Sequence, residues 1–284
     1  MTIQTQDADS LLRRSVFIEA DELARILGDA RQHVVLLDVR LDEEGRQAYL
    51  REHAEGAVYV DLAESFAGKQ EGLSGKRPLP QVHDLQRDAR RWGIRNDSLV
   101  VLYDDNGNRQ AARGWWTLRW AGLDNVVLLD GGLGAWRKAA LPVNSGVPLP
   151  ELGDVNLSAG HLPVLDADGA AEFARSATLI DARGASAYRG EDSGGHIPGA
   201  LNYPTSENLD AEGRFLPADE LRQRFRHLAS GADRLGIYCG GGVAASHQIA
   251  ALASIGITAS LFPGSWSAWS SDPARPVAMG GEPG

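Results

Sequence analysis

A single cysteine, Cys239, lies where an apolar run meets three consecutive glycines. The run 235–238 has the composition of a buried strand, and residues 243–255 are rich in Ala, Leu and Ile, which favours a helix. A strand-to-helix turn built from glycines lets the backbone fold closely around the sulfur, so that several N–H groups point at it. The residues expected to form this cradle are Gly240, Gly241, Gly242, Val243 and Ala244.

Such a cradle would stabilise an anion, and the positive N-terminal end of the following helix would favour the thiolate form of Cys239. A thiolate in this position is a nucleophile. The alternative is that Cys239 is a small buried hydrophobic residue, as most lone cysteines are. The strand, the glycines and the helix together favour the reactive cysteine.

Length and composition indicate two folded domains. The chain has 284 residues, of which 43% are hydrophobic, enough for two cores. No apolar run approaches the length of a membrane span, and residues 1–7 lack the basic and apolar regions of a signal peptide. We therefore expect a cytoplasmic protein without membrane association.

Charge and cysteine content exclude further classes of site. One cysteine leaves no intramolecular disulfide and no zinc site of the multi-cysteine type. The net charge of −10 argues against a nucleic-acid partner. Because the whole chain is negatively charged, a site that binds an anion must attract it against the overall negative potential of the protein.

The two halves of the sequence repeat each other in the same order of markers, which indicates a diverged duplication. Asp104 stands in the first half at the position that Cys239 holds in the second. The paired markers are 34–40 with 178–183, 49–57 with 188–200, 99–104 with 235–239, and 130–136 with 263–269.

Each half alternates short apolar runs with helical patterns, which predicts an α/β fold of parallel strands with helices on both faces. The first half should have strands near 34–38, 58–60, 98–103 and 126–129, and helices near 20–28, 42–51, 82–92, 109–121 and 132–139. The second should have strands near 178–181, 200–203, 234–238 and 258–261, with its longest helix just after Cys239. Residues 1–140 and 166–284 then form two domains, joined by a Pro- and Gly-rich linker at 141–165.

These elements together resemble the tandem-domain rhodanese family, sulfurtransferases that include the thiosulfate and 3-mercaptopyruvate enzymes. The resemblance covers nearly the whole chain. It implies two rhodanese-like domains, of which only the C-terminal one carries the reactive cysteine. The motifs that carry it are the Asp-x-Arg of each half, the Tyr…His-Ile-Pro-Gly-Ala run at 188–200, the cysteine loop at 239–244, and Phe-Pro-Gly-Ser-Trp-Ser-Ala-Trp at 262–269.

The resemblance implies a reaction that also suits the cradled thiolate. Cys239 would attack the outer sulfur of a small anionic donor, carry it as a persulfide, and pass it to cyanide, a thiol or a protein cysteine. The loop amides would hold the transferred sulfur. No cofactor and no metal would be needed.

The donor site departs from the family pattern. Gly241 replaces the serine of a triad proposed for the mercaptopyruvate enzymes, and Ala63 replaces its aspartate. Of the two family arginines that bind the donor, one aligns with Ala187 and the other falls in the shortened segment 190–196. The loop pattern is nonetheless closer to the mercaptopyruvate enzymes than to the thiosulfate enzymes.

Two remaining arginines are candidates for donor binding, Arg183 and Arg189. Arg183 could instead form a structural pair with Asp181, and Arg189 could be a solvated surface residue. His196 is expected to fix a turn rather than to act as a base, and His247 should lie two helical turns past Cys239.

Two other functions compete with sulfur transfer from a small donor. A cysteine phosphatase of the common type needs an arginine six positions after its cysteine, where this chain has Ala245, so that function is disfavoured. The second is a persulfide carrier that receives sulfur from another enzyme. A cation within reach of the Cys239 sulfur would favour an anionic donor, and its absence would favour the carrier.

Overall fold

The computed structural model describes residues 3–192, 194–229 and 234–284. The chain divides into two compact units, which are described separately. The first unit comprises residues 1–68, 79–161 and 211–215, and the second comprises 69–78, 162–210 and 216–284. Two short segments therefore belong to the unit built mainly from the other half of the sequence. Segment 69–78 belongs to the second unit, and segment 211–215 belongs to the first.

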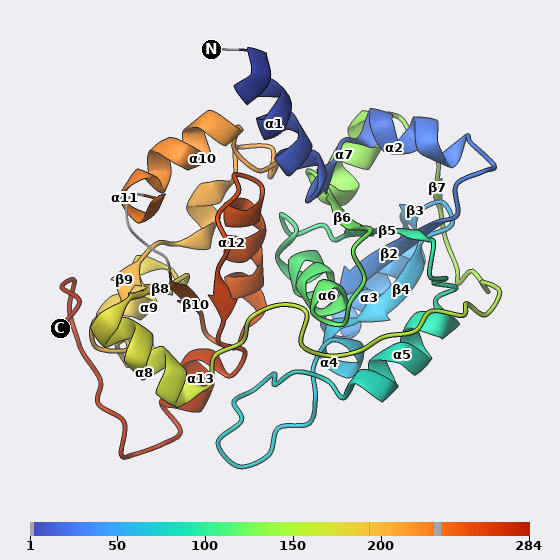
Figure 1. The fold of residues 1–284 in the computed structure, drawn as a ribbon. Coiled ribbons are helices and arrows are strands. Elements are labelled where there is room, and N and C mark those ends of the chain that lie inside the picture. Colours follow the sequence, from blue (N-terminus) through green and yellow to red (C-terminus); the bar gives the residue numbers. More distant parts are fainter. Residues whose placement is uncertain (1–2, 193, 230–233) are drawn as a thin grey trace. The chain divides into compact units, whose positions relative to one another are not determined.

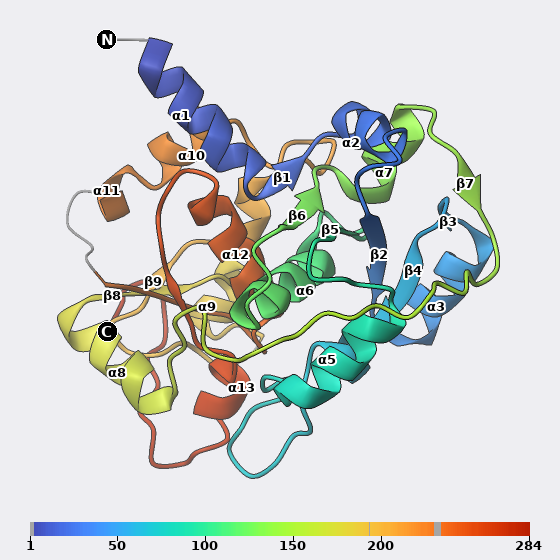
Figure 2. The ribbon, with the colours of Figure 1, turned by 45° about the vertical axis from the view of Figure 1, so that its right-hand side comes forward.

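The first unit contains a parallel sheet in the order β1-β6-β5-β2-β4, visible in Figure 2. Its central strands are almost wholly buried, as their continuous Val and Leu content indicates. A short antiparallel pair, β3 with β7, lies outside this sheet. The strands are β1 Phe17–Ile18, β2 Val34–Arg40, β3 His53–Ala54, β4 Val58–Asp61, β5 Leu99–Tyr103, β6 Val126–Leu129 and β7 Val143–Asn144.

Helices cover both faces of this sheet. α2 and α7 pack with alternate residues of the strands in one core cluster, while α6 packs against the other face through Gly114, which lies directly over Leu102. The helices are α1 Ile3–Arg14, α2 Ala20–Leu27, α3 Asp42–Arg51, α4 Leu62–Ser65, α5 Val82–Arg91, α6 Arg109–Trp120 and α7 Gly132–Lys138 (Figure 1).

The second unit repeats this plan with four parallel strands in the order β11-β10-β8-β9. They are β8 Thr178–Asp181, β9 Leu201–Asn202, β10 Leu235–Tyr238 and β11 Ser260–Leu261. α8 and α13 share a core cluster with these strands, and α12 packs against β10 and β11. The helices are α8 Ala167–Ser176, α9 Ala185–Arg189, α10 Ala218–Arg224, α11 Arg226–Ala229, α12 Val243–Ala253 and α13 Ser265–Trp269, with the 3-10 helix η1 Thr205–Asn208.

The duplication is visible at the level of single hydrogen bonds. The Tyr49 hydroxyl donates to the Ala57 carbonyl at 2.7 Å, and Tyr188 makes the same bond to Ala200 at 2.7 Å. The ring of His196 stacks on Tyr188, and its Nδ1 lies 2.8 Å from the Tyr188 carbonyl oxygen. His53 and Tyr49 repeat both contacts. The two halves therefore share the turn that leads into β4 and β9.

The structure confirms the predicted fold class and the strands and helices expected in each half. α12, with 11 residues, begins four residues after Cys239 as expected. In the first half, sequence patterns missed α1, α4 and the two-residue strands β1, β3 and β7; in the second half they gave no ranges for α8, α9, α10, α11 and η1. Of the expected linker, residues 141–161 belong to the first unit and 162–165 to the second.

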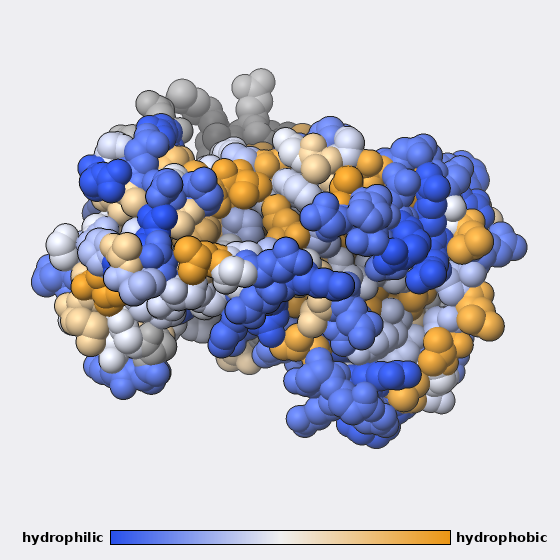
Figure 3. Space-filling model, turned by 90° about the horizontal axis from the view of Figure 1, so that it is seen from below, coloured by the Kyte–Doolittle hydropathy of each residue, from blue (hydrophilic) through white to orange (hydrophobic). Residues whose placement is uncertain are grey.

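The surface carries no extended apolar face in the view of Figure 3, where hydrophilic residues dominate and hydrophobic ones form small patches. Within the described residues, no helix combines the length and apolar character that crossing a membrane would require.

Candidate active site

Cys239 follows directly on β10, at the carboxyl end of the second unit's sheet. The backbone turns from the strand into α12 within three glycines, and Gly242 has φ +79°, a conformation that favours glycine. Cys239 is buried, with 2% of its surface exposed, whereas Gly240 is exposed. The sequence therefore places the sulfur inside a tight loop whose outer surface is open.

One predicted cradle amide contacts the sulfur directly. The backbone N–H of Gly242 donates to Cys239 Sγ at 3.1 Å. Val243 and Ala244 form the first turn of α12, where backbone N–H groups have no partner within the helix. Among the described residues, the Gly242 amide is the one loop donor whose contact with the sulfur is established.

The first turn of α13 holds this loop in place through backbone bonds. Trp266 N–H donates to the Cys239 carbonyl at 2.9 Å, and Ser267 N–H donates to the Gly240 carbonyl at 3.0 Å. The short helix that carries the Ser-Trp motif therefore fixes the loop's conformation.

Ser265, which the sequence analysis did not single out, lies beside the cysteine. Its hydroxyl oxygen accepts a hydrogen bond from the Cys239 backbone N–H at 3.1 Å, donates to the Phe262 carbonyl at 2.8 Å, and lies 4.0 Å from Sγ. Ser265 has φ +52°, a strained conformation for a residue with a side chain. Its place directly after Pro263-Gly264 in the Pro-Gly-Ser-Trp run was the available signal.

Arg183 is engaged with Asp181. Its Nε and Nη2 lie 3.0 and 2.6 Å from the two carboxylate oxygens, and Nη2 also donates to the Gly195 carbonyl at 2.7 Å. Its guanidinium stacks over the Trp266 ring, 4.7 Å from the centroid, and the side chain is 8% exposed. Arg183 therefore forms the structural pair with Asp181 that the sequence analysis gave as the alternative to donor binding.

Arg189 lies on the surface at the end of α9, with 44% of its side chain exposed. Its Nε pairs with Glu191 at 2.6 Å, and this hydrogen bond raises the pKa of Arg189 and lowers that of Glu191. An exposed pair of this kind contributes little to stability.

The remaining residues considered from the sequence are buried in the second unit. His247 lies within α12, and its Nδ1 is 2.6 Å from the Thr205 hydroxyl of η1. Trp266 and Trp269 belong to the core cluster with Phe173. Within the described residues, no group of three or more His, Cys, Asp or Glu side chains could hold a metal ion.

The segment 69–78, which belongs to the second unit, brings two cationic residues to the cysteine loop. Gly75 is buried with φ +81°, and a Cβ there would lie 2.4 Å from the Gly264 carbonyl oxygen. The next backbone N–H, of Lys76, donates to the Ser267 hydroxyl at 2.9 Å. A Cβ added to Gly241 would lie 3.7 Å from Nη1 of Arg77. The guanidinium of Arg77 therefore lies against the cysteine loop.

Sequence reasoning did not connect Arg77 with Cys239. The two residues are in different halves of the sequence, and nothing in the Gly-Lys-Arg-Pro run at 75–78 indicates which unit it joins. A basic pair flanked by Gly75 and Pro78 in a chain of net charge −10 was the only signal.

In the first unit, the loop at the corresponding position holds a carboxylate. Asp104 is fully buried, and its two oxygens accept four backbone N–H groups at 2.7 to 3.0 Å, from Asn106, Asn108, Gln110 and Ala111. Burial raises the pKa of Asp104, and the four amide hydrogen bonds oppose this rise. A turn of this type at the end of this strand therefore binds an anion.

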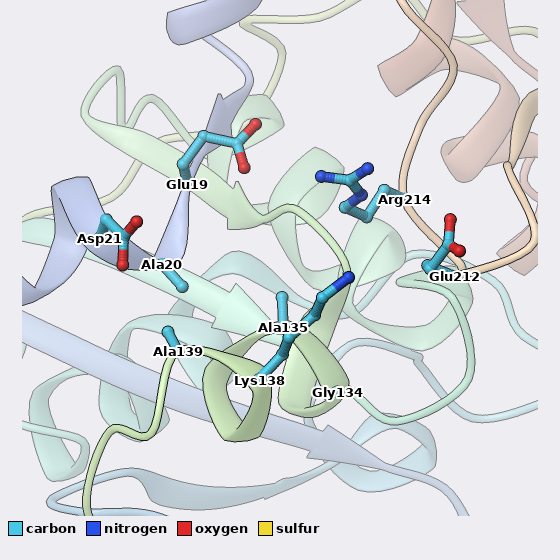
Figure 4. A pocket seen from close by; sticks show the side chains of 9 residues that line it. All are labelled: Glu19, Ala20, Asp21, Gly134, Ala135, Lys138, Ala139, Glu212 and Arg214. Carbon is cyan, nitrogen blue, oxygen red and sulfur yellow. The ribbon is translucent and has the colours of Figure 1, made fainter.

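A separate pocket of about 440 Å³ lies in the first unit, between the start of α2, α7 and the segment 211–215 (Figure 4). Its charged side chains are Glu19, Asp21, Lys138, Glu212 and Arg214. These charges are of both signs, and the described residues that line the pocket include no Cys, Ser or Thr.

Comparison with known proteins agrees with this geometry. The model of the rhodanese-like domain matches twice, at residues 19–139 and 159–272. A Mycobacterium tuberculosis protein provisionally named thiosulfate sulfurtransferase SseB is 44% identical over 94% of this chain and 98% of its own length. A Pseudomonas aeruginosa protein provisionally named 3-mercaptopyruvate sulfurtransferase is 39% identical over 93% of this chain and 98% of its own.

A solved structure gives the same result. The crystal structure of SseA, a 3-mercaptopyruvate sulfurtransferase from Escherichia coli, superposes with a TM-score of 0.77 at 30% identity, covering 88% of this chain and 98% of that one. Two matched domains, similar relatives of nearly equal length and a shared fold lead to one conclusion. The chain belongs to the rhodanese family, among its two-domain sulfurtransferases.

Proposed function

We propose that this protein moves a sulfane sulfur from a small anionic donor, 3-mercaptopyruvate or thiosulfate, to a thiophilic acceptor through a persulfide on Cys239. The observation that carries the proposal is the Gly242 N–H donating to Sγ at 3.1 Å, in a tight loop at the start of α12. Amide hydrogen bonds and a helix N-terminus favour a thiolate, the form that attacks sulfur.

In the first half-reaction, the Cys239 thiolate attacks the sulfur that is transferred. With thiosulfate, the S–S bond breaks and sulfite leaves with the electron pair. With 3-mercaptopyruvate, the C–S bond breaks, and the departing enolate takes a proton to become pyruvate. In both cases Cys239 keeps the sulfur as a persulfide.

In the second half-reaction, an acceptor nucleophile attacks the outer sulfur of this persulfide. The S–S bond breaks, and the Cys239 thiolate is regenerated. Cyanide yields thiocyanate, and a thiol or a protein cysteine yields a new persulfide. The amides of residues 240–244 would stabilise the charge on sulfur in both steps.

The loop composition favours 3-mercaptopyruvate over thiosulfate as the donor. The sequence Cys-Gly-Gly-Gly-Val-Ala at 239–244 has no basic residue, in contrast to the loop cations of the thiosulfate enzymes. The relatives at 44% and 39% identity carry the names of both activities, so they do not decide between the donors.

The persulfide-carrier alternative is favoured by one observation: Arg183 and Arg189 are both paired with carboxylates, at Asp181 and Glu191. The position of Arg77 against Gly241 supports a small anionic donor instead. We therefore place the carrier second.

The test is the intact mass of the reduced protein after incubation with each donor. We expect wild type to gain one sulfur, about 32 Da, and the Cys239→Ala variant to gain nothing, because the thiolate is the nucleophile. The donor that loads faster identifies the preferred substrate. If neither donor adds mass and a persulfidated protein does, the carrier function replaces the proposed one.

A further inference from the structure

The family arginines for donor binding are missing here, so the proposed function leaves the donor's negative charge without a partner. A carboxylate or sulfonate placed near a chain of net charge −10 needs a local cation to bind well. Arg183 and Arg189 are engaged with Asp181 and Glu191. Another segment of the second unit also brings cations to the cysteine loop.

Segment 69–78 supplies such a cation in a fixed position. Gly75 packs its backbone so closely against Gly264 that no side chain would fit there, and the Ser267 hydroxyl accepts the N–H of Lys76. The Ser74 carbonyl oxygen also lies 3.0 Å from where a Cβ on Gly264 would stand. The backbone leading to Arg77 is thereby held against the same turn that fixes the Cys239 loop.

The side chain of Arg77 then reaches the loop itself. Its Nη1 lies 3.7 Å from the position of a Cβ on Gly241, at van der Waals distance, and Lys76 Cβ lies at the same distance. Arg77 is partly buried, while Lys76 is exposed.

The loop also leaves room for a ligand beside this guanidinium. Gly240 is exposed, and among the described residues a Cβ on it would meet no atom within 4 Å. An anionic donor over Gly240 would have the loop amides on one side and the Arg77 fork on another. A planar guanidinium can bind a carboxylate or two sulfonate oxygens through paired N–H groups.

We propose that Arg77, supported by the charge of Lys76, binds the anionic group of the sulfur donor beside the Cys239 loop. This inference rests on the proposed function for the donor's identity. The ligand class is a small sulfur compound whose transferable sulfur is bonded directly to a sulfonate-type group, as in thiosulfate, or is joined to a carboxylate through a CH2–CO unit, as in 3-mercaptopyruvate. Arg77 is a binding residue here, and the sulfur chemistry remains with Cys239.

The first experiment does not depend on sulfur transfer. Iodoacetate and iodoacetamide both alkylate a thiolate with loss of iodide, and they differ chiefly in charge, so their rate ratio at the single cysteine reports the local field. In Arg77→Gln we expect this ratio to fall about fivefold, the effect of one nearby charge. Arg77→Lys should restore much of it. Lys69→Gln, an exposed change in the same segment, should leave it unchanged.

The second experiment measures steady-state transfer to cyanide with each donor. Arg77→Gln should raise KM by about ten- to a hundredfold, the usual effect of losing a charge-assisted hydrogen bond, with kcat changed far less. A purely structural role would lower the rates of both alkylating reagents together and shift Tm. Such a parallel loss, or an unchanged KM, would overturn the assignment of Arg77.

Different results would refute sulfur transfer through Cys239 and donor binding by Arg77. If wild type gains no sulfur from either donor, the proposed function is wrong whatever the alkylation ratio shows. If wild type is loaded and Arg77→Gln is loaded equally well at donor concentrations below KM, the sulfurtransferase stands and only the role of Arg77 is lost.

Discussion

The Asp104 loop of the first unit and the Cys239 loop of the second follow corresponding strands, β5 and β10, and lead into corresponding helices, α6 and α12. Each is held by the same backbone bond from the next motif: Leu133 N–H donates to the Asp104 carbonyl, and Trp266 N–H donates to the Cys239 carbonyl, both at 2.9 Å. They differ in what their amides bind. The first loop encloses its own carboxylate with four N–H groups, and in the second the Gly242 N–H donates to the Cys239 sulfur.

This difference explains how one scaffold serves two purposes. In the first loop, a carboxylate that belongs to the chain, Asp104, permanently accepts the four amide hydrogen bonds. A thiolate can bond covalently to a substrate atom, so the second loop can bind an anion that arrives and leaves. The same turn thus holds a buried carboxylate in one unit and, in the proposed function, the reactive sulfur in the other.

The largest expected effect comes from removing the sulfur. Cys239→Ser should lower sulfur transfer at least about a thousandfold, because a serine hydroxyl forms no persulfide. Its free energy of unfolding should stay within about 1 kcal/mol of wild type, since size and burial change little. The cyanide assay and urea unfolding measure the two quantities. Activity retained in this variant would place the reaction elsewhere.

Removing the Asp104 carboxylate from the loop of the first unit should lower stability and leave sulfur transfer largely unchanged. Asp104→Ala leaves four N–H groups without their acceptor, two of them buried and two partly buried, and should cost on the order of 4 kcal/mol of folding free energy. The folded fraction should still load sulfur at Cys239. Asp97→Ala, an exposed change just before β5, is the matched control. Its free energy of unfolding in urea should stay near that of wild type. Equal stability of the two variants would show that the Asp104 cradle contributes nothing.

A second buried carboxylate of the first unit, Asp130, stands where the second unit has Pro263. It accepts hydrogen bonds from Phe215 N–H and Arg13, yet burial raises its pKa to about 6. A raised carboxyl pKa adds stability at low pH that is lost as the pH rises from about 4 to about 6.

Comparing the stability of wild type and Asp130→Asn across this pH range tests that value. The difference between the two curves should change by roughly 2–3 kcal/mol in favour of the Asn variant as the pH rises. Chemical denaturation at pH 4, 5, 6 and 7 provides the curves. A constant difference would mean that the pKa of Asp130 is not raised.

The smallest effect concerns the position where Gly132 in the first unit corresponds to Ser265 in the second. Both have positive φ, +55° and +52°. Ser265→Ala keeps the strain and loses the hydroxyl's bonds, whereas Ser265→Gly loses the bonds and relieves the strain. We expect Gly to be more stable than Ala by about 1 kcal/mol in thermal unfolding. The reverse order would indicate that Ser265 is not strained.

Local patterns were sufficient for much of this structure. The strands β2, β5, β8 and β10 are apolar runs bounded by polar residues, and the repeat of Asp-x-Arg and His motifs fixed their correspondence. The loop at Cys239 could be predicted because strand, glycines and helix are consecutive. The contacts made by Ser265 could not, because they join residues 26 positions apart through a backbone conformation that serine seldom adopts.

Arg77 marks the limit of reasoning from the sequence. Its location depends on segment 69–78 packing with the second unit, which follows from a close contact between Gly75 and Gly264 and from no periodic pattern. Similarly, Asp104 was recognised as the counterpart of Cys239, but its four amide bonds follow from the turn geometry of residues 106–111.

The exchange of segments 69–78 and 211–215 between the units has a consequence for the history of the chain. A freshly duplicated gene encodes two copies that can each fold alone. In this chain, segment 69–78 of the first half belongs to the second unit. A C-terminal fragment that begins after residue 161 would therefore lack Gly75, Lys76 and Arg77. The two halves have thereby become a single heritable unit, in which a mutation at residue 75 can alter the surroundings of a cysteine encoded in the other half.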